Sequence, residues 1–328
     1  TIGYQLPHSY HEASLLVIQK HGSRPRYRAI FRFRYLHGIL FHPYSGVTTV
    51  NIEGTEVDAS GCTDVGRVRQ HNQDHYLIAS LRRSLDIEST SLPSEMVDNF
   101  GRGAQALLLL VADGVGGGAG GEEASTHTLD TIVQYVAGSY HFFDRVEVDG
   151  LEAFRNDLTF AVQWSHAALR ERTTDVSPEL TGMASTLTLA LVKWPRAFVC
   201  QVGDSRCYHF RPPHLNQITT DQTLARQMVQ QGFMPEESAE RSPLGHVLSQ
   251  AIGYSEADVW PVISEVQLET GDLLLLCSDG LMKHVSDAQI AELLSTSTSA
   301  SEAASSLVGA ALNGGGSDNV TVVAARFA

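Results

Sequence analysis

From about residue 56 onward, short apolar runs that end near Gly, Asp or Pro alternate with longer stretches of helical periodicity. The apolar runs predict strands over 56–62, 75–79, 106–112, 184–192, 197–203, 206–210, 259–267, 272–278 and 319–327. Apolar residues at helical spacing predict helices over 121–138, 150–171, 222–231, 286–295 and 299–312, and a polar loop is expected over 84–103. Because strands follow one another in groups, we expect antiparallel sheets with helices on their outer faces.

The first part of the chain has a different composition, with arginines interspersed among aromatic residues between Arg24 and Tyr35. Residues 1–55 carry six Lys or Arg and two acidic residues, whereas the rest of the chain carries 17 and 35. This contrast predicts a basic, aromatic N-terminal extension of unknown role over 1–54 and an acidic main domain over 55–328. The extension could form a short strand, or bind a membrane surface or nucleic acid. A segment simply appended to the body is favoured, since this is common at chain ends.

The charge balance limits the classes of partner. A formal net charge of −14 argues against a nucleic-acid-binding protein, because phosphate backbones repel an acidic surface. Phosphorylated substrates stay open, since bound metal ions can reverse the local field of an acidic site. No apolar run is long enough to span a bilayer and no signal peptide is evident, so a cytoplasmic protein without a transmembrane segment is expected. The scattered Cys62, Cys200, Cys207 and Cys277 predict reduced thiols rather than a zinc site.

Two segments of the chain are near copies of each other, Leu107–Gly114 and Leu273–Gly280. Each is a largely apolar run, as expected of a strand buried on both faces, and each ends in Asp-Gly. A single Asp-Gly pair is more often a turn than a site. Two buried strands that deliver Asp113 and Asp279 to the same relative place are harder to explain as turns, because buried carboxylates are costly without cations.

Further acidic residues stand at the ends of predicted strands, namely Asp74, Asp204 and Asp318. A sheet scaffold can bring such carboxylates together from distant parts of the chain. Hard divalent ions such as Mg²⁺ or Mn²⁺ prefer oxygen ligands, and two such ions can activate water and polarise a phosphoryl group. The pattern therefore predicts a site for divalent metal ions.

A glycine-rich stretch, Gly114–Gly121, leads from the first Asp-Gly into a predicted helix. Glycine next to Asp113 lets the backbone carbonyl approach an ion. A nucleotide-binding loop is the alternative, but the Walker Lys-Ser/Thr is missing and no dinucleotide-binding spacing fits. For a substrate phosphate, Arg69 is the leading candidate because a guanidinium matches phosphate oxygens. An isolated arginine is ordinarily a solvated surface residue, and only the position of Arg69 in the chain favours a role in phosphate binding.

Taken in order, these motifs strongly resemble the bacterial branch of the metal-dependent serine/threonine protein phosphatases, the PPM or type-2C family. The matching segments are Thr63–Asp74, Val111–Gly117, Thr181–Thr186, Val202–Arg206, Leu276–Leu281 and Ser317–Thr321. The resemblance covers about 56–328 and leaves 1–54 unexplained. It implies an α+β fold, a four-layer α-β-β-α sandwich of two antiparallel sheets flanked by helices, with metal ions at one end.

The resemblance also implies a role for each site residue. Asp113 would bridge two Mn²⁺ or Mg²⁺ ions, and Gly114 would offer its carbonyl to one of them. Asp279 and Asp318 would complete the shell of the other ion. Asp74 would bind a metal ion or its waters, and Arg69 would bind the substrate phosphate. Asp204 would bind a third and more weakly held ion. The segment 211–245 would form a variable flap that shapes substrate access.

Several residues depart from the family pattern, of which Ala184 and Ser185 are conservative changes and three others matter for the site. Gln73 stands where many relatives have Glu, which removes one charge from the metal shell. Val115 replaces a histidine proposed as the general acid in eukaryotic relatives, so leaving-group protonation would be less assisted or fall to a metal-bound water. Lys283 stands where relatives often carry Asp or Asn near the third ion. Like-charge repulsion favours a weakened third ion, and the alternative is that the ammonium partly replaces that ion.

The expected reaction is in-line attack of a metal-bridging hydroxide on a phosphoserine or phosphothreonine ester, with Asp113, Asp279 and Arg69 as the catalytic residues. The partners would be phosphorylated proteins, with a cognate serine/threonine kinase as a family expectation. One alternative is a weak or inactive pseudophosphatase that binds phosphoproteins or a kinase. Another is a metal-dependent nuclease, which the acidic body disfavours. Cysteine-based phosphatases and Ser-His-Asp hydrolases are disfavoured because their sequence motifs are missing.

Overall fold

A computed structural model of the chain describes residues 48–82, 105–116, 119–138, 150–175, 182–239, 242–255 and 257–328. These residues all belong to one compact unit, Gly46–Ala328. The predicted loop over 84–103 and the segment between Arg24 and Tyr35 lie outside the described residues, so the predictions made for them stay predictions.

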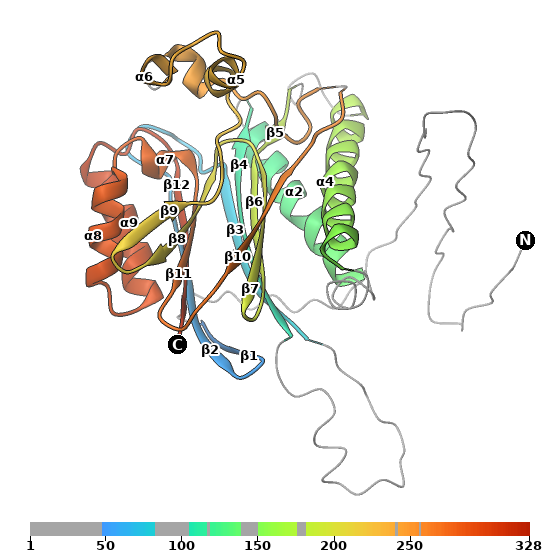
Figure 1. Cartoon of the computed structure of the whole chain (residues 1–328). Coiled ribbons are helices and arrows are strands. Elements are labelled where there is room, and N and C mark those ends of the chain that lie inside the picture. The colour runs from blue at the N-terminus through green and yellow to red at the C-terminus, as the bar shows by residue number, and fades with distance from the viewer. Residues whose placement is uncertain are drawn as a thin grey trace, which may run out of the picture. The chain divides into compact units, whose positions relative to one another are not determined.

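Two antiparallel sheets form the centre of this unit (Figure 1). The first sheet has the strand order β1 (Thr48–Ile52), β2 (Thr55–Asp64), β12 (Val320–Phe327), β11 (Leu273–Cys277), β8 (Arg206–Arg211) and β9 (His214–Gln217). The second sheet has the order β10 (Val262–Gln267), β7 (Arg196–Val202), β6 (Leu187–Lys193), β4 (Ala106–Val115) and β3 (Asp74–Leu81), and the short β5 (Ala184–Ser185) pairs with the end of β4.

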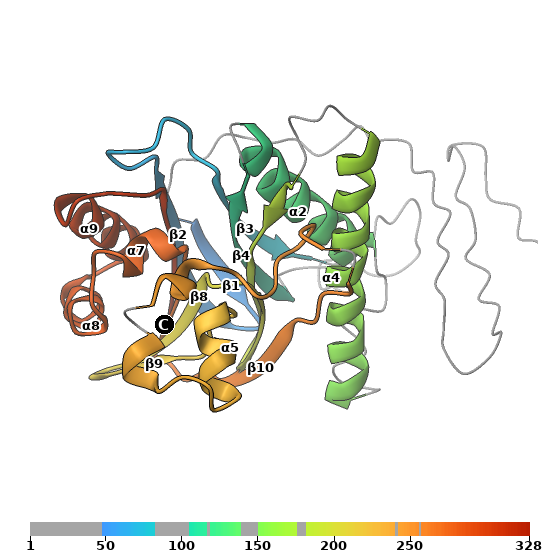
Figure 2. The same cartoon turned by 90° about the horizontal axis from the view of Figure 1, so that it is seen from above.

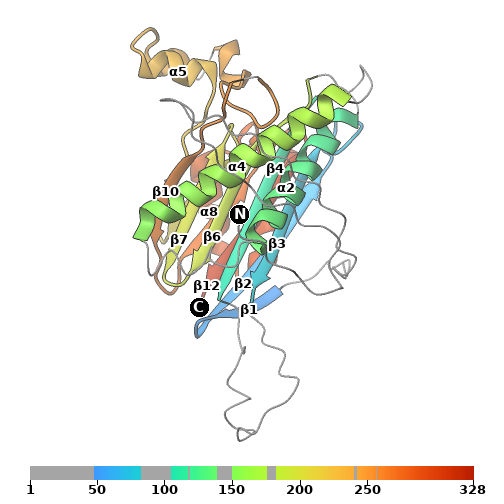
Figure 3. The same ribbon diagram turned by 90° about the vertical axis from the view of Figure 1, so that its right-hand side faces the viewer.

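Helices cover the outer face of each sheet (Figure 1 and Figure 2). The second sheet is covered by α2 (Ala119–Gly138) and α4 (Gly150–Asp175), and the first by α8 (Asp287–Thr296) and α9 (Ala300–Asn313), with the short α7 (Asp279–Met282) directly after β11. Figure 3 shows α5 (Leu224–Gln230) beyond one end of the strands, where α6 (Glu236–Ala239) and a 3₁₀ turn (Pro243–His246) follow it along the chain. The predicted four-layer α-β-β-α sandwich is confirmed.

The apolar core has three layers, one between the two sheets and one between each sheet and its helices. These layers explain why the sequences of the central strands are uninterrupted hydrophobic runs. In β4, Leu108 and Leu110 pack towards α2 and α4, while Leu107 and Leu109 pack between the two sheets. Strand β11 repeats this division, with its outer face turned to α8 and α9. The four leucines of β4 are at most 1% exposed, and burial of each contributes about 1.5–3 kcal/mol. The apolar runs are therefore confirmed as strands buried on both faces.

The predicted strands and helices are present, with shifts at several ends. The strand predicted over 184–192 is divided at Thr186 into β5 and β6, although its register with β4 continues and the Thr186 backbone N–H donates to the Asp113 carbonyl oxygen (2.8 Å). The strand predicted over 259–267 begins only after Pro261, which lacks the N–H that a sheet ladder requires. Both corrections concern residues near the strand ends rather than the strands themselves.

Several short elements escaped the sequence patterns, namely β1, β9, α6 and α7. The predicted boundary between 54 and 55 falls at the turn that joins β1 to β2, where Glu53 and Gly54 take positive φ values (49° and 95°). Strand β1 pairs with β2 along its whole length and buries Val50 and Ile52. The compact body therefore begins upstream of the predicted boundary, and the separate role of residues 1–54 stays a prediction.

Two further sequence expectations concern thiols and membrane segments. All four cysteines are free, and Cys200, Cys207 and Cys277 are buried, as expected of reduced thiols in strands. Of the helices in the described ranges, none combines the length and the apolar character that crossing a bilayer requires.

Candidate active site

The predicted metal ligands gather at one end of the sandwich, where strands of both sheets begin or end. In the second sheet, Asp74 opens β3 and lies directly opposite Asp113, near the end of β4. In the first sheet, Asp279 follows β11 and Asp318 precedes β12. The Ser278 hydroxyl donates to Asp74 Oδ2 (2.6 Å) and so joins the ends of the two sheets. Strand pairing thereby brings together carboxylates that are far apart in the sequence.

When they are ionised, Asp74 and Asp113 place negative charge where the described residues do little to offset it. Asp74 is 3% exposed, and its Oδ1 has no hydrogen-bond partner among the residues that the structure describes. Burial raises the pKa of Asp74 to about 7, against the hydrogen bond from Ser278 and with added repulsion from neighbouring carboxylates. Burial, followed by the charges of Asp74 and three further aspartates, holds the pKa of Asp113 well above its usual range. A divalent cation would relieve this accumulation of charge.

Asp279 and Asp318 are held instead by side-chain cations. Lys283 Nζ lies 2.6 Å from Asp279 Oδ2 and 2.7 Å from Asp318 Oδ2. Arg69 binds the same Asp318 carboxylate, with Nε 2.7 Å from Oδ1 and Nη2 2.9 Å from Oδ2. Burial alone would raise the pKa of Asp318, but hydrogen bonds from Arg69 and Lys283 lower it below its ordinary value. Among the residues that the structure describes, one pair of carboxylates thus forms ion pairs with side-chain cations and the other pair forms none.

Asp204 lies in the turn between β7 and β8. Burial, followed by the charges of Asp279 and Asp221, raises the pKa of Asp204 to about 7, and Lys283 acts in the opposite direction. Asp204 therefore lies within electrostatic reach of Asp279, while its role towards a third ion stays a prediction.

Hydroxyl and amide side chains hold these carboxylates in place. The sequence patterns did not identify these residues. Thr186 Oγ1 accepts a hydrogen bond from the Asp113 backbone N–H (3.0 Å) and lies 2.7 Å from the Ser205 hydroxyl. Asn319 Oδ1 accepts from the Gln73 backbone N–H (2.9 Å), and its Nδ2 donates to two carbonyls of the loop before β3. Ser205 and Asn319 each directly follow a predicted ligand, and this adjacency is the signal that could have found them.

The glycine after each of the two near-identical strands is required by close packing of backbones. A Cβ atom on Gly114 would overlap the carbonyl group of Gly121, and a Cβ atom on Gly280 would overlap that of Asn319. The Gly114 N–H also donates to the Gln73 carbonyl oxygen (3.1 Å). Both glycines thus hold the carboxylates in place through packing, while the role of the Gly114 carbonyl towards an ion stays a prediction.

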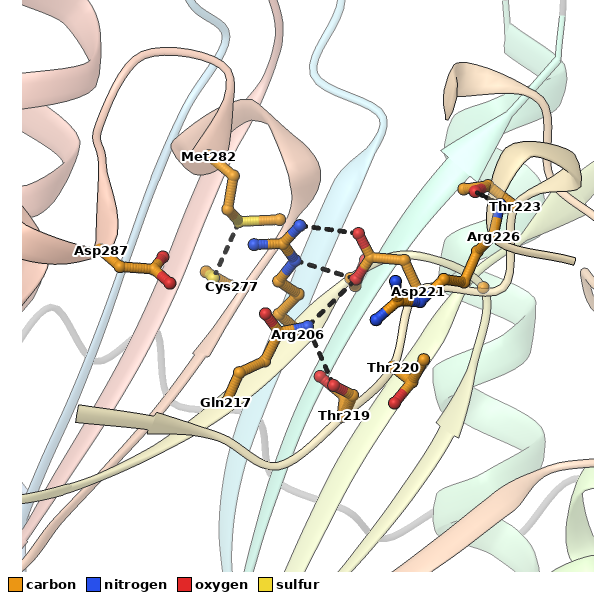
Figure 4. A network of polar contacts seen from close by, with 12 residues as sticks. Arg206, Gln217, Thr219, Thr220, Asp221, Thr223, Arg226, Cys277, Met282 and Asp287 are labelled. Atoms are coloured by element: carbon orange, nitrogen blue, oxygen red, sulfur yellow. Dashed lines mark hydrogen bonds and ion pairs between the residues drawn. The ribbon is translucent and has the colours of Figure 1, made fainter. Parts of the chain in front are cut away.

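Arg206 is a structural cation near Asp204. Its Nε and Nη2 donate to the two carboxylate oxygens of Asp221 (2.8 and 2.7 Å), as Figure 4 shows, and its Nη1 donates to the Tyr208 hydroxyl (2.9 Å). Gln217 Nε2 lies 3.3 Å from the same carboxylate. Because Asp221 stands just before α5, these contacts tie the segment that carries α5 and α6 to the sheet.

The donor set fits divalent ions of the Mg²⁺ or Mn²⁺ kind. Across the described ranges, no three His, Cys, Asp or Glu side chains lie close enough together to hold an ion by themselves. Mg²⁺ takes one or two carboxylates and keeps several waters, so the unrelieved charge of Asp74 and Asp113 suits such an ion. The donors are oxygen atoms, which such hard ions prefer, whereas structural zinc sites favour sulfur and nitrogen.

Comparison with known proteins places these features among phosphatases. The sequence profile described as Protein phosphatase 2C matches residues 97–314. The serine/threonine protein phosphatase PstP of Mycobacterium tuberculosis is 37% identical over 222 residues, which cover 68% of this chain and 40% of PstP. The chain thus spans about two fifths of the length of this curated relative.

Solved structures agree with the sequence matches. The structure of the S. agalactiae serine/threonine phosphatase is similar with a TM-score of 0.68 at 26% identity, covering 82% of this chain and 99% of that one. The catalytic domain of PstP in complex with two manganese ions is similar with a TM-score of 0.61 at 31% identity, covering 85% and 99%.

Proposed function

Because the chain belongs to the protein phosphatase 2C family, we propose that it hydrolyses phosphoserine and phosphothreonine esters of proteins with bound divalent metal ions. The observation that carries this proposal is the pair Asp74 and Asp113, which lie opposite each other with raised pKa values. The PstP catalytic domain solved with two manganese ions supports it. A pseudophosphatase would have no physical need for buried carboxylates that depend on outside cations.

The residues proposed to hold the ions stand at the strand ends. They are Asp74, Asp113, the Gly114 carbonyl, Asp279 and Asp318, with Asp204 beside a third and more weakly held ion. When bound, Mn²⁺ or Mg²⁺ supplies the Lewis acidity that activates water and offsets the charge of a phosphoryl group. The protein's own contribution is to hold these oxygens in register, through the strand pairing of Asp74 with Asp113 and through the Ser278 hydroxyl.

Arg69 is proposed to bind the substrate phosphate. Its side chain is 53% exposed, and two of its five N–H donors bond Asp318. The hydrogen bond to Asp318 raises the pKa of Arg69 further, so the guanidinium stays charged. A charged guanidinium at the rim of the carboxylate cluster can bind phosphate oxygens and orient the ester over the site.

The substrates are proposed to be phosphorylated proteins, with access shaped by the segment 211–245. Figure 3 shows α5 of this segment beyond the end of the strands. Phe233, in the same segment, is 74% exposed and offers an apolar contact to a protein chain. A serine/threonine kinase partner and a cytoplasmic location belong to the same proposal, and the free cysteines support a reducing compartment.

Release of phosphate from a phosphothreonine peptide tests this function. We expect turnover with Mn²⁺, none with EDTA, and a loss of about 100-fold or more in Asp279→Asn, since one lost ligand weakens an ion that the reaction needs. Glu269→Gln is the control, because this carboxylate is 66% exposed and lies before β11, at the other end of that strand. A protein that binds the phosphopeptide but releases no phosphate at any Mn²⁺ concentration would instead be a binding module.

A further inference from the structure

Lys283 is held firmly beside two of the proposed ligands. It caps α7, the four-residue helix that begins at Asp279, and its backbone N–H donates to the Asp279 carbonyl oxygen (3.1 Å). Cys277 Sγ donates to Met282 Sδ (3.4 Å), and this contact fixes the residue before Lys283 against the end of β11 (Figure 4). The Lys283 side chain is 25% exposed, and ion pairs with Asp279 and Asp318 hold its ammonium in place.

The ammonium joins carboxylates from two distant segments. Asp279 follows β11 and Asp318 precedes β12, and Lys283 Nζ lies within 2.7 Å of an oxygen of each. The two carboxylates are 22% and 16% exposed, so water screens these contacts less than it would a surface ion pair. One positive group therefore occupies the space between two proposed metal ligands.

We propose, on the basis of the proposed function, that Lys283 is a built-in counter-ion that occupies the cation position between Asp279 and Asp318. The ammonium keeps this corner of the site assembled without metal, and a divalent ion must displace or repel it to use the same two oxygens. The chain accordingly binds an ion weakly at this corner, while no side-chain cation in the described ranges forms an ion pair with Asp74 or Asp113. An ordinary salt bridge would link the segments but would leave metal binding unchanged.

Binding of Mn²⁺ to the full chain, measured by calorimetry and by the electron paramagnetic resonance signal of free Mn²⁺, tests this assignment. Lys283→Gln removes the charge, Lys283→Arg keeps it, and Lys193→Gln removes a charge at the far end of β6 as a matched control. We expect Lys283→Gln to bind one Mn²⁺ ion, the one at Asp279 and Asp318, about tenfold more tightly than the wild type, or to bind one more ion, since one partly screened repulsion is removed. Lys283→Arg and Lys193→Gln should match the wild type.

Thermal unfolding in EDTA provides a second readout that does not depend on turnover. Lys283→Gln should unfold at a lower temperature than the wild type without metal and regain the difference with Mn²⁺, because the ion then supplies the missing charge. Equal or weaker Mn²⁺ binding by Lys283→Gln would overturn the inference while leaving the proposed function intact. A wild type that binds no Mn²⁺ would overturn both, and a stability loss in EDTA alone would reduce Lys283 to a structural salt bridge.

Discussion

The ends of β4 and β11 carry nearly the same sequence and behave differently. Both strands are apolar on both faces, and both deliver an aspartate followed by a glycine. After Asp113 the chain continues as a strand and pairs with β5, whereas at Asp279 it turns directly into α7. The turn into a helix places Lys283 one turn beyond Asp279, where the two side chains meet. The strand that follows Asp113 provides no such partner.

This difference divides the site into two electrostatic halves. Asp279 and Asp318 have internal cations, so their geometry is stable in the absence of metal. Asp74 is buried and Asp113 is half-buried, both have raised pKa values, and neither forms an ion pair with a side-chain cation among the described residues. A repeated sequence motif therefore does not imply repeated chemistry, because the element that follows the motif decides which charges surround it.

The largest expected effect concerns the half without internal cations. Asp113→Asn keeps the shape of the side chain but removes the charge that attracts the ions. We expect kcat for a phosphothreonine peptide to fall about 1,000-fold or more, equivalent to about 4 kcal/mol of barrier. Steady-state kinetics at saturating Mn²⁺ would measure it, with Glu269→Gln as the control, and less than a tenfold loss would contradict the assigned role.

The two glycines test whether the two strand ends need the same close packing. Gly114→Ala and Gly280→Ala each force a Cβ atom into a neighbouring carbonyl group, so each should lower the free energy of unfolding by about 2–4 kcal/mol. Gly309→Ala in α9, where a Cβ atom meets nothing within 4 Å, is the control and should be neutral or stabilising. Urea unfolding of the three variants measures this, and equal stabilities would refute the packing argument.

A smaller effect is expected at the start of β11, where Asp272 is paired and 1% exposed. Burial alone would raise the pKa of Asp272, but hydrogen bonds from Arg211, the Glu269 backbone and His209 lower it. A pKa lowered by folding adds stability above the unfolded value of about 3.9 that is lost as the pH falls through the folded value. Asp272→Asn should therefore cost about 2 kcal/mol at pH 7, with the gap to wild type narrowing below about pH 4. Urea midpoints from pH 7 to pH 3 measure the stability difference between the variant and the wild type. A difference that grew on acidification would contradict the prediction.

The smallest effects should have opposite signs in the two halves of the site. Without metal, Asp113→Asn removes a carboxyl group whose raised pKa costs stability at neutral pH, and it should raise the free energy of unfolding by about 1 kcal/mol. Asp279→Asn removes a partner of Lys283 and should lower it by about the same amount. Urea unfolding in EDTA measures the free energy of unfolding of both variants. A change of the same sign in both would contradict the division of the site into two electrostatic halves.

Much of this arrangement follows from the sequence, because buried strands have a strong pattern. The runs that contain Leu107 and Leu273 predicted strands buried on both faces, and both are confirmed. The break at Thr186 and the helix that starts at Asp279 were missed, since both depend on hydrogen bonds and packing with distant segments. The contact of the Lys283 ammonium with Asp318 could not be predicted from the sequence either, because it depends on the register of β11 with β12.

Anomalous X-ray diffraction at the manganese edge, from crystals grown with Mn²⁺, tests the central claim most directly. If the carboxylates without internal cations hold the ions, anomalous peaks will lie within about 2.0–2.3 Å of oxygens of Asp113, as expected for a hard divalent ion. Any peak between Asp279 and Asp318 should be weaker, because Lys283 competes there. Crystals of active protein with no peak at Asp113, or with the strongest peak elsewhere, would contradict the account.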